Sequence, residues 1–384
     1  MLKGFKTEIY PTEEQKLRIN KTIGTCRFIY NFYLAYNKEL YDSDGKFMTG
    51  RDFSLWLNNV FLPEHPEKKW IKEVSSKSVK KSIENGYTAF QKFFKGKAGY
   101  PNFKRKGKSD PKMYFVRNNL NDCISERHRL KIPTLGWVRL KEKGYIPVSK
   151  DGYQIRSGTV SARAGRYYVS VLIEMPDMEP VRSRSSGIGI DLGIKDLAIV
   201  SDGSVYESIN RSKKMRKLER KLRKEQRSLS RKYEYAKQYK TERKNIKKQV
   251  LKVQRLHQRI TNIRTDHINK VISRIVKTKP SYIVIEDLNV SGMMKNRHLS
   301  KAVASQKLYE FRRKLETKCR QEGIELRVVG RFYPSSKMCH NCGNIKKDLK
   351  LSDRTYHCDR CGYKADRDFN ASLNLRDTKE YKIS

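Results

Sequence analysis

The chain has 384 residues, of which 85 are Lys or Arg and 41 are Asp or Glu, so its formal net charge at pH 7 is +44. Charge of this density repels itself in a compact protein, and the closely spaced phosphates of a nucleic acid neutralise it. No apolar stretch approaches the roughly 18 residues of a membrane helix, and the first eight residues contain no signal-peptide core. Composition therefore favours a nucleic-acid-binding protein of two or three domains and argues against a membrane partner and against secretion.

The N-terminal part predicts one short strand followed by helices. Residues 5–10 are strand-like and end at Pro11, and Thr12 and Gln15 have the spacing of a helix capping box. Behind this cap, apolar side chains recur at spacings of four and three, which predicts one buried helix face. These side chains are Ile19, Ile23, Cys26, Tyr30 and Tyr33. A second helix is expected over residues 76–95.

The next segment predicts a small antiparallel barrel or sandwich. Short β-rich runs alternate with turn signals, and the clearest unit is a hairpin in which residues 159–163 meet residues 166–175 across Ala164 and Gly165. The opening strand could complete this sheet, so that the helices are an insertion. The expected domains are a β-barrel of residues 1–10 and 113–180 and a helical domain of residues 11–112.

Residues 176–187, which are rich in Pro and Ser, predict a linker to a second half with a different character. Apolar, β-rich runs predict strands and a periodic run predicts a helix in that half. The strands are expected over residues 188–191, 197–200, 282–286 and 325–329, and the helix over residues 300–323.

Between Arg211 and Arg259 the chain has 21 Lys or Arg against four Glu. Apolar positions keep a helical period here, which predicts a long helical hairpin with one packed face. A solvated helix face is the usual explanation of such charge, but this imbalance favours contact with a nucleic-acid backbone. The candidate contacts are Arg216, Arg220 and Arg223.

Four of the seven cysteines form two Cys-x-x-Cys pairs separated by fifteen residues. Zn²⁺ prefers four thiolates at tetrahedral vertices, so this spacing predicts a structural zinc site with no open position for water. A redox dithiol is the alternative, and His340 and His357 could in principle ligate instead. The expected ligands are Cys339, Cys342, Cys358 and Cys361. The remaining cysteines, Cys26, Cys123 and Cys319, are expected to be buried thiols in a reducing compartment.

Three acidic residues lie at the boundaries of predicted strands and helices: Asp191, Glu286 and Asp368. Carboxylates on apolar strands are unfavourable unless they are compensated, and clustered carboxylates repel one another. Two Mg²⁺ ions would remove both problems and could activate water against a phosphodiester. An acid of this kind taken alone is more often a helix cap or an ion-pair partner, whereas the three together in this order favour a catalytic site.

Other catalytic motifs fit less well. A Gly-x-Gly at Gly187 and Gly189 could begin a dinucleotide loop, but Leu192 stands where the third glycine belongs. The sequence contains neither a P-loop nor a His-Glu-x-x-His motif, which argues against an NTPase or a zinc protease.

In combination, these motifs resemble the TnpB family of transposon-encoded RNA-guided DNA nucleases, which is related to type V CRISPR effectors. The likeness covers nearly the whole chain. The segments that carry it are Gly189-Ile190-Asp191-Leu192-Gly193, Ile285-Glu286-Asp287-Leu288, the Cys339–Cys361 ribbon with Asp366-Arg367-Asp368-Phe369-Asn370-Ala371, Tyr10-Pro11-Thr12, Arg27-Phe28-Ile29-Tyr30-Asn31 and Gly99-Tyr100-Pro101-Asn102-Phe103-Lys104.

The resemblance implies a multidomain α+β protein. Its nuclease domain would be RuvC-like with an RNase H fold, cover residues 181–330 and 366–384, and contain a zinc ribbon of residues 331–365 that binds target nucleic acid. The family's Asp-Glu-Asp triad carries over to Asp191, Glu286 and Asp368, with Asp366 as the fallback for the third acid.

The resemblance also implies the partners. These are a guide RNA from the transposon end and a matched double-stranded DNA target beside a short motif, with the N-terminal domains holding the RNA scaffold and reading that motif. We expect a monomer with one RNA in a prokaryotic cytoplasm, associated with the nucleoid when bound to DNA.

Two basic stretches of the N-terminal half are further candidates for nucleic-acid contact. Lys77, Lys80 and Lys81 could approach the duplex that carries the motif, and Lys104 and Arg105 lie among aromatic residues suited to base stacking. The alternative is that Phe90, Phe93 and Phe94 are helix core and that the lysines are merely solvated.

Two other functions remain open at this stage. The first is a nuclease-inactive or weakly active, RNA-guided DNA-binding repressor of transcription, against which the intact acids argue. The second is a transposase that joins strands with a similar carboxylate fold.

Overall fold

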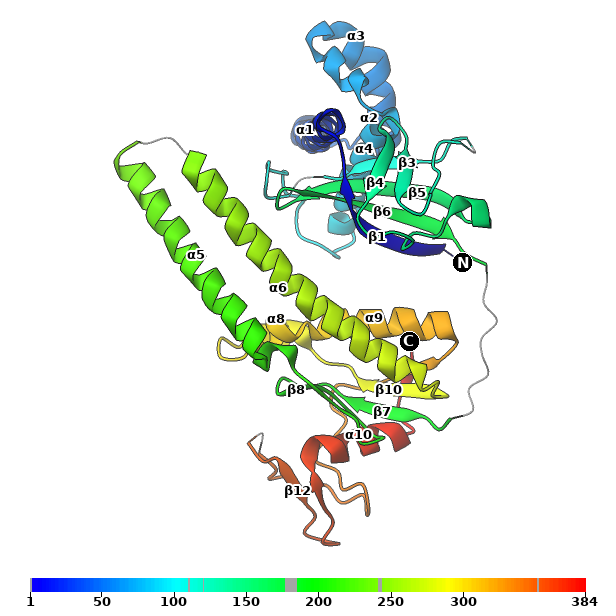
Figure 1. Ribbon diagram of the computed structural model, residues 1–384, viewed down its shortest axis with the longest axis vertical. Helices are drawn as coiled ribbons and strands as arrows, with labels where there is room; N and C mark the ends of the chain where they lie inside the picture. Colours follow the sequence, from blue (N-terminus) through cyan, green and yellow to red (C-terminus); the bar gives the residue numbers. More distant parts are fainter. Residues whose placement is uncertain (1, 110, 120, 177–184, 241–243, 351) are drawn as a thin grey trace. The chain divides into compact units, whose positions relative to one another are not determined.

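The computed structural model describes residues 2–109, 111–119, 121–176, 185–240, 244–350 and 352–384 (Figure 1). These residues form two compact units, the first ending at Asp177 and the second beginning at Met178. Most of the linker expected over residues 176–187 lies outside the described residues. Within the part of the chain that is described, no helix has the length and apolar character needed to cross a bilayer.

The first unit contains a six-stranded antiparallel sheet whose order is β2-β5-β6-β1-β4-β3. Its strands are β1 (Leu2–Tyr10), β2 (Met113–Val116), β3 (Arg129–Ile132), β4 (Gly136–Leu140), β5 (Gln154–Arg163) and β6 (Arg166–Glu174). The opening strand β1 lies between β6 and β4, so it completes the sheet as the sequence predicted. The predicted small antiparallel barrel is present as an open, half-barrel sheet, because β2 and β3 remain edges among the described residues. Each has only four residues, which leaves few backbone groups to pair across the gap.

The helices of the first unit lie between β1 and β2 in the chain. They are α1 (Glu13–Asp44), α2 (Gly50–Trp56), a π-helical segment (Leu57–Phe61), α3 (Leu62–Glu64), a 3₁₀ segment (Pro66–Glu73) and α4 (Ser76–Phe94), and a 3₁₀ turn (Ser149–Asp151) precedes β5. The capping box is confirmed: the Gln15 amide donates to Thr12 Oγ1 at 3.2 Å, and the Thr12 amide donates to Gln15 Oε1 at 3.0 Å. All five residues of the predicted α1 face are buried.

The second unit is built on a mixed sheet with the order β14-β11-β10-β7-β8-β9. Its strands are β7 (Ile188–Asp191), β8 (Asp196–Val200), β9 (Val205–Glu207), β10 (Tyr282–Glu286), β11 (Glu325–Val329) and β14 (Lys382–Ile383). The strands β7, β10 and β11 run parallel, whereas β8, β9 and β14 pair antiparallel with their neighbours. The four strands expected in this half are therefore confirmed.

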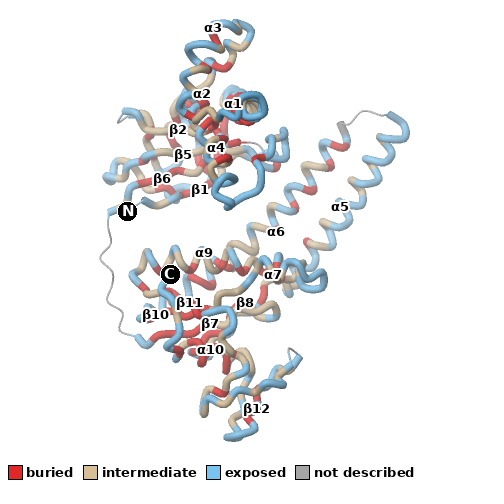
Figure 2. Tube along the Cα trace, turned by 180° about the vertical axis from the view of Figure 1, so that it is seen from behind, coloured by how far each residue is buried: buried red, intermediate tan, exposed pale blue. Residues whose placement is uncertain are grey.

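Helices cover both faces of this sheet (Figures 1 and 2). They are a 3₁₀ turn (Ile209–Arg211), α5 (Lys213–Gln238), α6 (Lys244–Lys277), α7 (Val290–Lys295), α8 (Ser300–Gln306), α9 (Leu308–Glu322) and α10 (Arg367–Asp377), and a small hairpin of β12 (Thr355–His357) and β13 (Lys364–Asp366) precedes α10. Apolar residues of α6 and α9 pack on Ile190 and Ile285. On the opposite face Leu375 of α10 packs on Val284. The predicted basic hairpin is formed by α5 and α6, and α5 is largely exposed (Figure 2).

The single helix expected over residues 300–323 is wrong, because the chain breaks between α8 and α9 at Lys307, which has a φ of +57°. The buried side chain of Gln306 donates to the carbonyls of Gly193 and Ile194 at 3.1 and 2.8 Å and accepts from Ser208 Oγ. These anchors tie the end of α8 to the loop after β7. The turn at Lys307 lets α9 resume in another direction.

Gly189 allows α10 to lie directly against β7. A Cβ at this position would stand 2.0 Å from the Ser372 carbonyl oxygen and 2.5 Å from the Arg376 amide nitrogen. Both atoms belong to the backbone, so they could move only if the helix itself shifted. The absence of a side chain at Gly189 is therefore what sets the distance between α10 and the strand that carries Asp191.

We expect Gly189→Ala to lower the free energy of unfolding by about 1–3 kcal/mol, because the added methyl group overpacks two backbones. Gly330→Ala is a matched control in the same unit, since a Cβ there would meet no atom within 4 Å. Denaturant titration of both variants measures the difference. Equal loss of stability in the two would contradict the packing described here.

Candidate metal centre and active site

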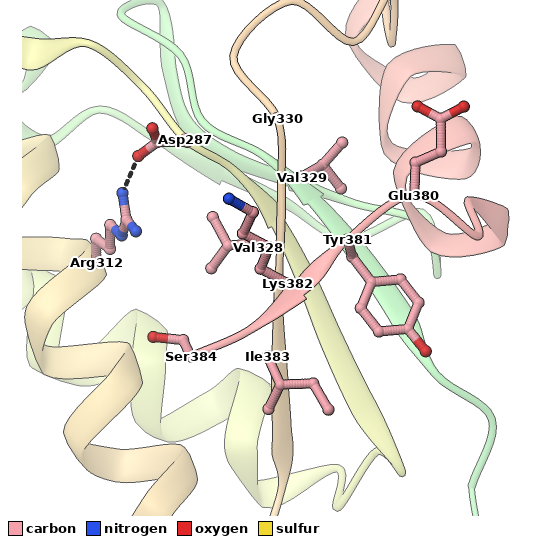
Figure 3. Close-up of a pocket in the computed structure, with 10 residues that line it drawn as sticks. All are labelled: Asp287, Arg312, Val328, Val329, Gly330, Glu380, Tyr381, Lys382, Ile383 and Ser384. Atoms are coloured by element: carbon pink, nitrogen blue, oxygen red, sulfur yellow. Dashed lines mark hydrogen bonds and ion pairs between the residues drawn. The ribbon is translucent and has the colours of Figure 1, made fainter.

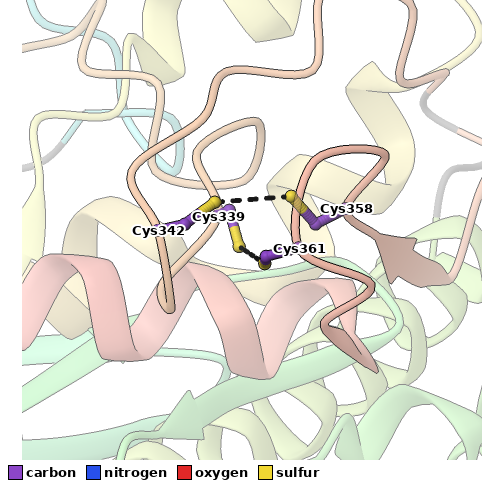
Figure 4. A group of neighbouring side chains, drawn as sticks. All are labelled: Cys339, Cys342, Cys358 and Cys361. Carbon is purple, nitrogen blue, oxygen red and sulfur yellow. Dashed lines mark hydrogen bonds between the residues drawn. The ribbon is translucent and has the colours of Figure 1, made fainter.

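The four predicted metal ligands converge on one point (Figure 4). Their sulfur atoms all lie within 4.8 Å of one another, and the pairs Cys339–Cys361 and Cys342–Cys358 are 3.6 Å apart. A Zn–S bond of about 2.3 Å in a tetrahedron places neighbouring sulfurs about 3.8 Å apart. The group can therefore hold a metal ion such as zinc. We call each Cys-x-x-Cys turn a knuckle; each close sulfur pair joins a cysteine of one knuckle to a cysteine of the other, unlike a redox dithiol, whose two sulfurs belong to the same turn.

Backbone geometry makes the two knuckles alike. Gly343 and Gly362 have φ values of +73° and +72°, and their amides donate to the carbonyls of Cys339 and Cys358 at 2.9 and 3.0 Å. A hydrogen bond from the Tyr363 backbone lowers the pKa of the Cys361 thiol to about 6. Burial instead raises the pKa of the Cys339 thiol to about 12, so the backbone favours the thiolate at Cys361 but not at every cysteine of the group.

The remaining candidates for this centre have other surroundings. His340 Nε2 lies 3.8 Å from Asp377 Oδ2 and His357 Nδ1 lies 3.9 Å from Asp359 Oδ1, so neither histidine replaces a cysteine in the group. The other three cysteines, Cys26, Cys123 and Cys319, are buried as expected.

The cysteine knuckle is fastened to α10 by two buried asparagines. Asn370 donates to the Met338 carbonyl at 2.7 Å and accepts from the His340 amide at 3.1 Å. Asn374, one turn later, also donates to Met338, at 2.7 Å. The knuckle therefore rests on the helix whose first turn contains Asp368.

Strand register brings two of the three predicted acids together. Ile190 of β7 pairs with Ile285 of the parallel strand β10. The next residues, Asp191 and Glu286, therefore stand side by side at the carboxyl ends of adjacent strands and project to the same face. That face is the one covered by α10.

Helix α10 brings the third acid to the same edge. Its Ser372 and Arg376 lie against Gly189, so Asp368, one turn before Ser372, extends toward the end of β7. Burial, together with the negative charges of Asp368 and Glu286, raises the pKa of Asp191 to about 7. Burial, with the charge of Asp287, also raises the pKa of Glu286 to about 7.

Two arginines compensate part of this negative charge. Arg367 donates to Asp368 Oδ1 at 2.7 Å and Arg354 lies 3.5 Å from Oδ2, while Arg367 lowers the pKa of Asp191. Asp366, the fallback third acid, instead caps α10 by accepting from the amides of residues 368 and 369 at 3.0 Å. Among the described residues the three carboxylates do not form a group as tight as the cysteines.

A second group of ion-paired side chains stabilises the end of β10, at the residue that follows Glu286. Asp287 pairs with Arg312 of α9 and with Arg331, the latter at 3.0 Å, and these pairs lower its pKa. Asp287 and Arg312 line a pocket of about 540 Å³ that the C-terminal strand also lines (Figure 3). Neither this cluster nor Arg367 was predicted from the sequence, although the arginine between the acids at residues 366 and 368 was a visible signal.

The predicted nucleic-acid contacts lie in different environments. Lys77, Lys80, Arg105, Arg216, Arg220 and Arg223 are exposed. Lys81 pairs with Glu84 at 2.9 Å, and Lys104 Nζ lies 3.8 Å from the ring centre of Tyr30. Burial lowers the pKa of Lys104, so this lysine joins the fold rather than facing solvent.

The aromatic residues between 90 and 103 and the basic residues of α5 also differ in how far they are exposed to solvent. Phe90 is core, whereas Phe93, Phe94, Tyr100 and Phe103 are exposed. On α5, a shallow pocket with a volume of about 410 Å³ is lined only by cationic side chains. These are Arg220, Arg223, Lys224, Arg227 and Arg231.

Comparison with known proteins places these features in one family. The E. coli K12 protein InsQ, named as an RNA-guided DNA endonuclease, is 32% identical over 393 residues, which cover 97% of this chain and 91% of that protein. A Streptomyces pristinaespiralis protein with the same designation is 33% identical, over 97% of this chain and 88% of its own. The chain belongs to the TnpB family.

Family models agree with this membership. Residues 170–297 match the OrfB/IS605 model described as a probable transposase, residues 309–375 match the Cas12f1-like TNB domain and residues 1–46 match a helix-turn-helix domain. The solved Cas12f1–sgRNA–target DNA complex is a more remote match, at 17% identity and a TM-score of 0.37, over 99% of this chain and 100% of that one. Of the residues that match the helix-turn-helix model, those described in the present structure (2–46) contain β1 and the long helix α1.

We expect Cys342→Ser to abolish the bound metal, because three thiolates hold the ion far less tightly than four. Elemental analysis should find about one zinc ion per chain in the purified parent and none in the Cys342→Ser variant. Chelation of the parent should likewise destabilise the C-terminal part, since the knuckle supports α10. Cys123→Ser, a buried thiol outside the group, is the control and should retain the metal.

The raised pKa of Asp191 predicts how stability depends on pH without added Mg²⁺. The unfolded chain releases this proton near the ordinary pKa of 3.8 and the folded protein only near 7, so the unfolded state binds fewer protons between these values. Stability should fall as pH rises from 5 to 8. Asp191→Asn should flatten this decline and melt several degrees higher than the parent at pH 8. Calorimetry of both proteins between pH 5 and pH 8 measures this difference. The same dependence of melting temperature on pH in the parent and in the variant would contradict the burial and charge repulsion inferred at Asp191.

Proposed function

We propose that this protein cuts double-stranded DNA matched by a guide RNA, next to a short motif, as the endonuclease of a transposable element. Membership of the TnpB family supports an RNA-guided endodeoxyribonuclease. The observation that carries the site assignment is the position of Asp191, Glu286 and Asp368 at one sheet edge, where burial and the negative charges of the other two acids raise the pKa of Asp191.

The order of the second sheet supports a RuvC-like nuclease domain. An antiparallel meander of β7, β8 and β9 is followed by β10 and β11, both parallel to β7. This agrees with the RNase H fold that the family resemblance implies. The boundaries of residues 181–330 and 366–384, with a zinc ribbon of residues 331–365 between them, are part of the proposal.

The donor set fits hard divalent cations. Asp191, Glu286 and Asp368 offer only carboxylate oxygens, which Mg²⁺ prefers, and their mutual repulsion is relieved when cations bind. Two Mg²⁺ ions would activate a water and stabilise the leaving oxygen of the phosphodiester. The carboxylates of this chain would hold the site, and Arg367, already paired with Asp368, would turn toward the phosphate or continue to orient that acid.

The cysteine group has a structural role in this proposal. Four thiolates leave no coordination position for substrate, so Zn²⁺ would hold the knuckles together and thereby support α10 and Asp368. The two kinds of metal site thus differ in chemistry, one closed and soft, the other open and hard.

The partners follow from charge and family. The cation-lined surface of α5, which includes Arg220 and Arg223, suits a phosphate backbone of the guide RNA or of its duplex with DNA. The first unit, with Lys77, Lys80 and Arg105 exposed, would hold the RNA scaffold and read the motif through its barrel-like domain (residues 1–10 and 113–180) and its helical domain (residues 11–112). We propose one chain with one RNA.

The test is to express the chain with its native flanking DNA, sequence the RNA that co-purifies and assay Mg²⁺-dependent cleavage of a matched duplex. Glu286→Gln should reduce the cleavage rate by at least about a thousandfold while RNA and target binding persist, because a metal ligand contributes several kcal/mol to the transition state. Glu207→Gln, an exposed glutamate on the edge strand of the same sheet, is the matched control and should cut at the parental rate.

Two outcomes would contradict the proposal. Binding of the matched duplex without any cleavage by the parent would identify a guided repressor instead of a nuclease. Joining of transposon ends by the RNA-free protein would identify a transposase.

A further inference from the structure

The most exposed large apolar side chain among the described residues belongs to Phe332, which is 95% exposed. It lies in the loop that follows β11, between Arg331 and Tyr333, both of which make contacts within the fold. A phenylalanine ring exposed to this degree buries almost no apolar surface within the fold, so it is available to contact a partner.

The loop presents this ring from a fixed position. On one side Arg331 pairs with Asp287 at 3.0 Å. On the other side the Tyr333 hydroxyl donates to the Asn374 carbonyl of α10 at 3.3 Å, and the Tyr333 amide donates to the Gly330 carbonyl at 3.1 Å. The ring is thus held between two anchored neighbours, which reduces the entropy that would be lost when it binds a partner.

This fixed position is next to the candidate active site. Val329, the last residue of β11, pairs with Glu286 across parallel strands, and Phe332 follows it by three residues. Three residues span at most about 11 Å of extended chain. The ion pair between Arg331 and Asp287 limits the distance between Phe332 and Glu286 further. Arg331 directly precedes Phe332 in the chain, and Asp287 directly follows Glu286. A phosphate bound at the carboxylates would therefore have its own or the next nucleotide within reach of the ring.

We propose that Phe332 stacks on an unpaired nucleobase of the DNA strand being cut, within about two nucleotides of the scissile phosphate, and so holds that phosphate at the carboxylates. A base within a duplex has both faces covered, so only an unpaired base can accept the ring. Aromatic rings bind such bases with little dependence on sequence, as a guided nuclease requires. This inference rests on the proposed function and adds a substrate-contacting residue to it.

The experiment compares Phe332→Ala, Phe332→Leu and Phe332→Trp in single-turnover cleavage of a matched duplex. Loss of stacking should slow cutting about 5- to 100-fold in the alanine variant, and the leucine variant should be slow as well because it is apolar but not aromatic. The tryptophan variant should cut within about threefold of the parent. Affinity for the guide RNA and for the target should remain unchanged in all three.

A matched control is Tyr309→Ala, which removes an exposed aromatic ring from α9 in the same unit and should leave the rate unchanged. A direct readout of stacking uses 2-aminopurine placed at successive positions around the cut, in an Asp191→Asn background that keeps the DNA intact. Its fluorescence should be quenched at one or two positions by Phe332 and recover when residue 332 is alanine.

Parental cleavage rates in the alanine variant, or equal 2-aminopurine signals with and without the ring, would overturn the inference. Loss of target binding would do so too, because it would place Phe332 in binding rather than at the cut. If the alanine variant misfolds, the leucine and tryptophan pair still decides. If the parent does not cut at all, the proposed function fails, and the 2-aminopurine signal separately decides whether the ring stacks.

Discussion

The close contact between α10 and β7 at Gly189 is the constraint on which the site depends. A helix that approached only over a side chain would stand further from the sheet, and Asp368 would lie further from Asp191 and Glu286. At the observed approach the three acids share one edge, and burial together with the charges of Asp368 and Glu286 raises the pKa of Asp191. The fold thus maintains an electrostatically unfavourable arrangement that divalent cations would relieve.

The same helix connects the two candidate metal sites. Its buried face holds the cysteine knuckle through Asn370 and Asn374, and its first turn contains Asp368, which is oriented by Arg354 and Arg367. A well-ordered cysteine group therefore stabilises the position of α10, and through it the position of Asp368 beside Asp191 and Glu286. This arrangement gives the cysteine group, which lies immediately before Asp368 in the chain, a means of supporting that proposed catalytic residue.

Local patterns in the sequence were sufficient for much of the fold and of the site. The cap at Thr12, the buried face of α1 and the cysteine group are encoded by spacing within a short segment, so each could be predicted. The break at Lys307 could not, because it depends on Gln306 reaching carbonyls more than a hundred residues earlier. The close approach at Gly189 and the exposure of Phe332 could not be predicted for the same reason, since both are defined only by the folded surroundings.

The central claim is that the three carboxylates hold two divalent cations against the DNA backbone. It is tested most directly by an experimental structure of the protein with its guide RNA and a non-cleavable target, prepared with Mn²⁺ in place of Mg²⁺. The account predicts two anomalous scattering peaks roughly 4 Å apart, ligated by Asp191, Glu286 and Asp368 and bridged by one phosphate. A target-bound complex with Mn²⁺ elsewhere, or with none at these acids, would contradict it.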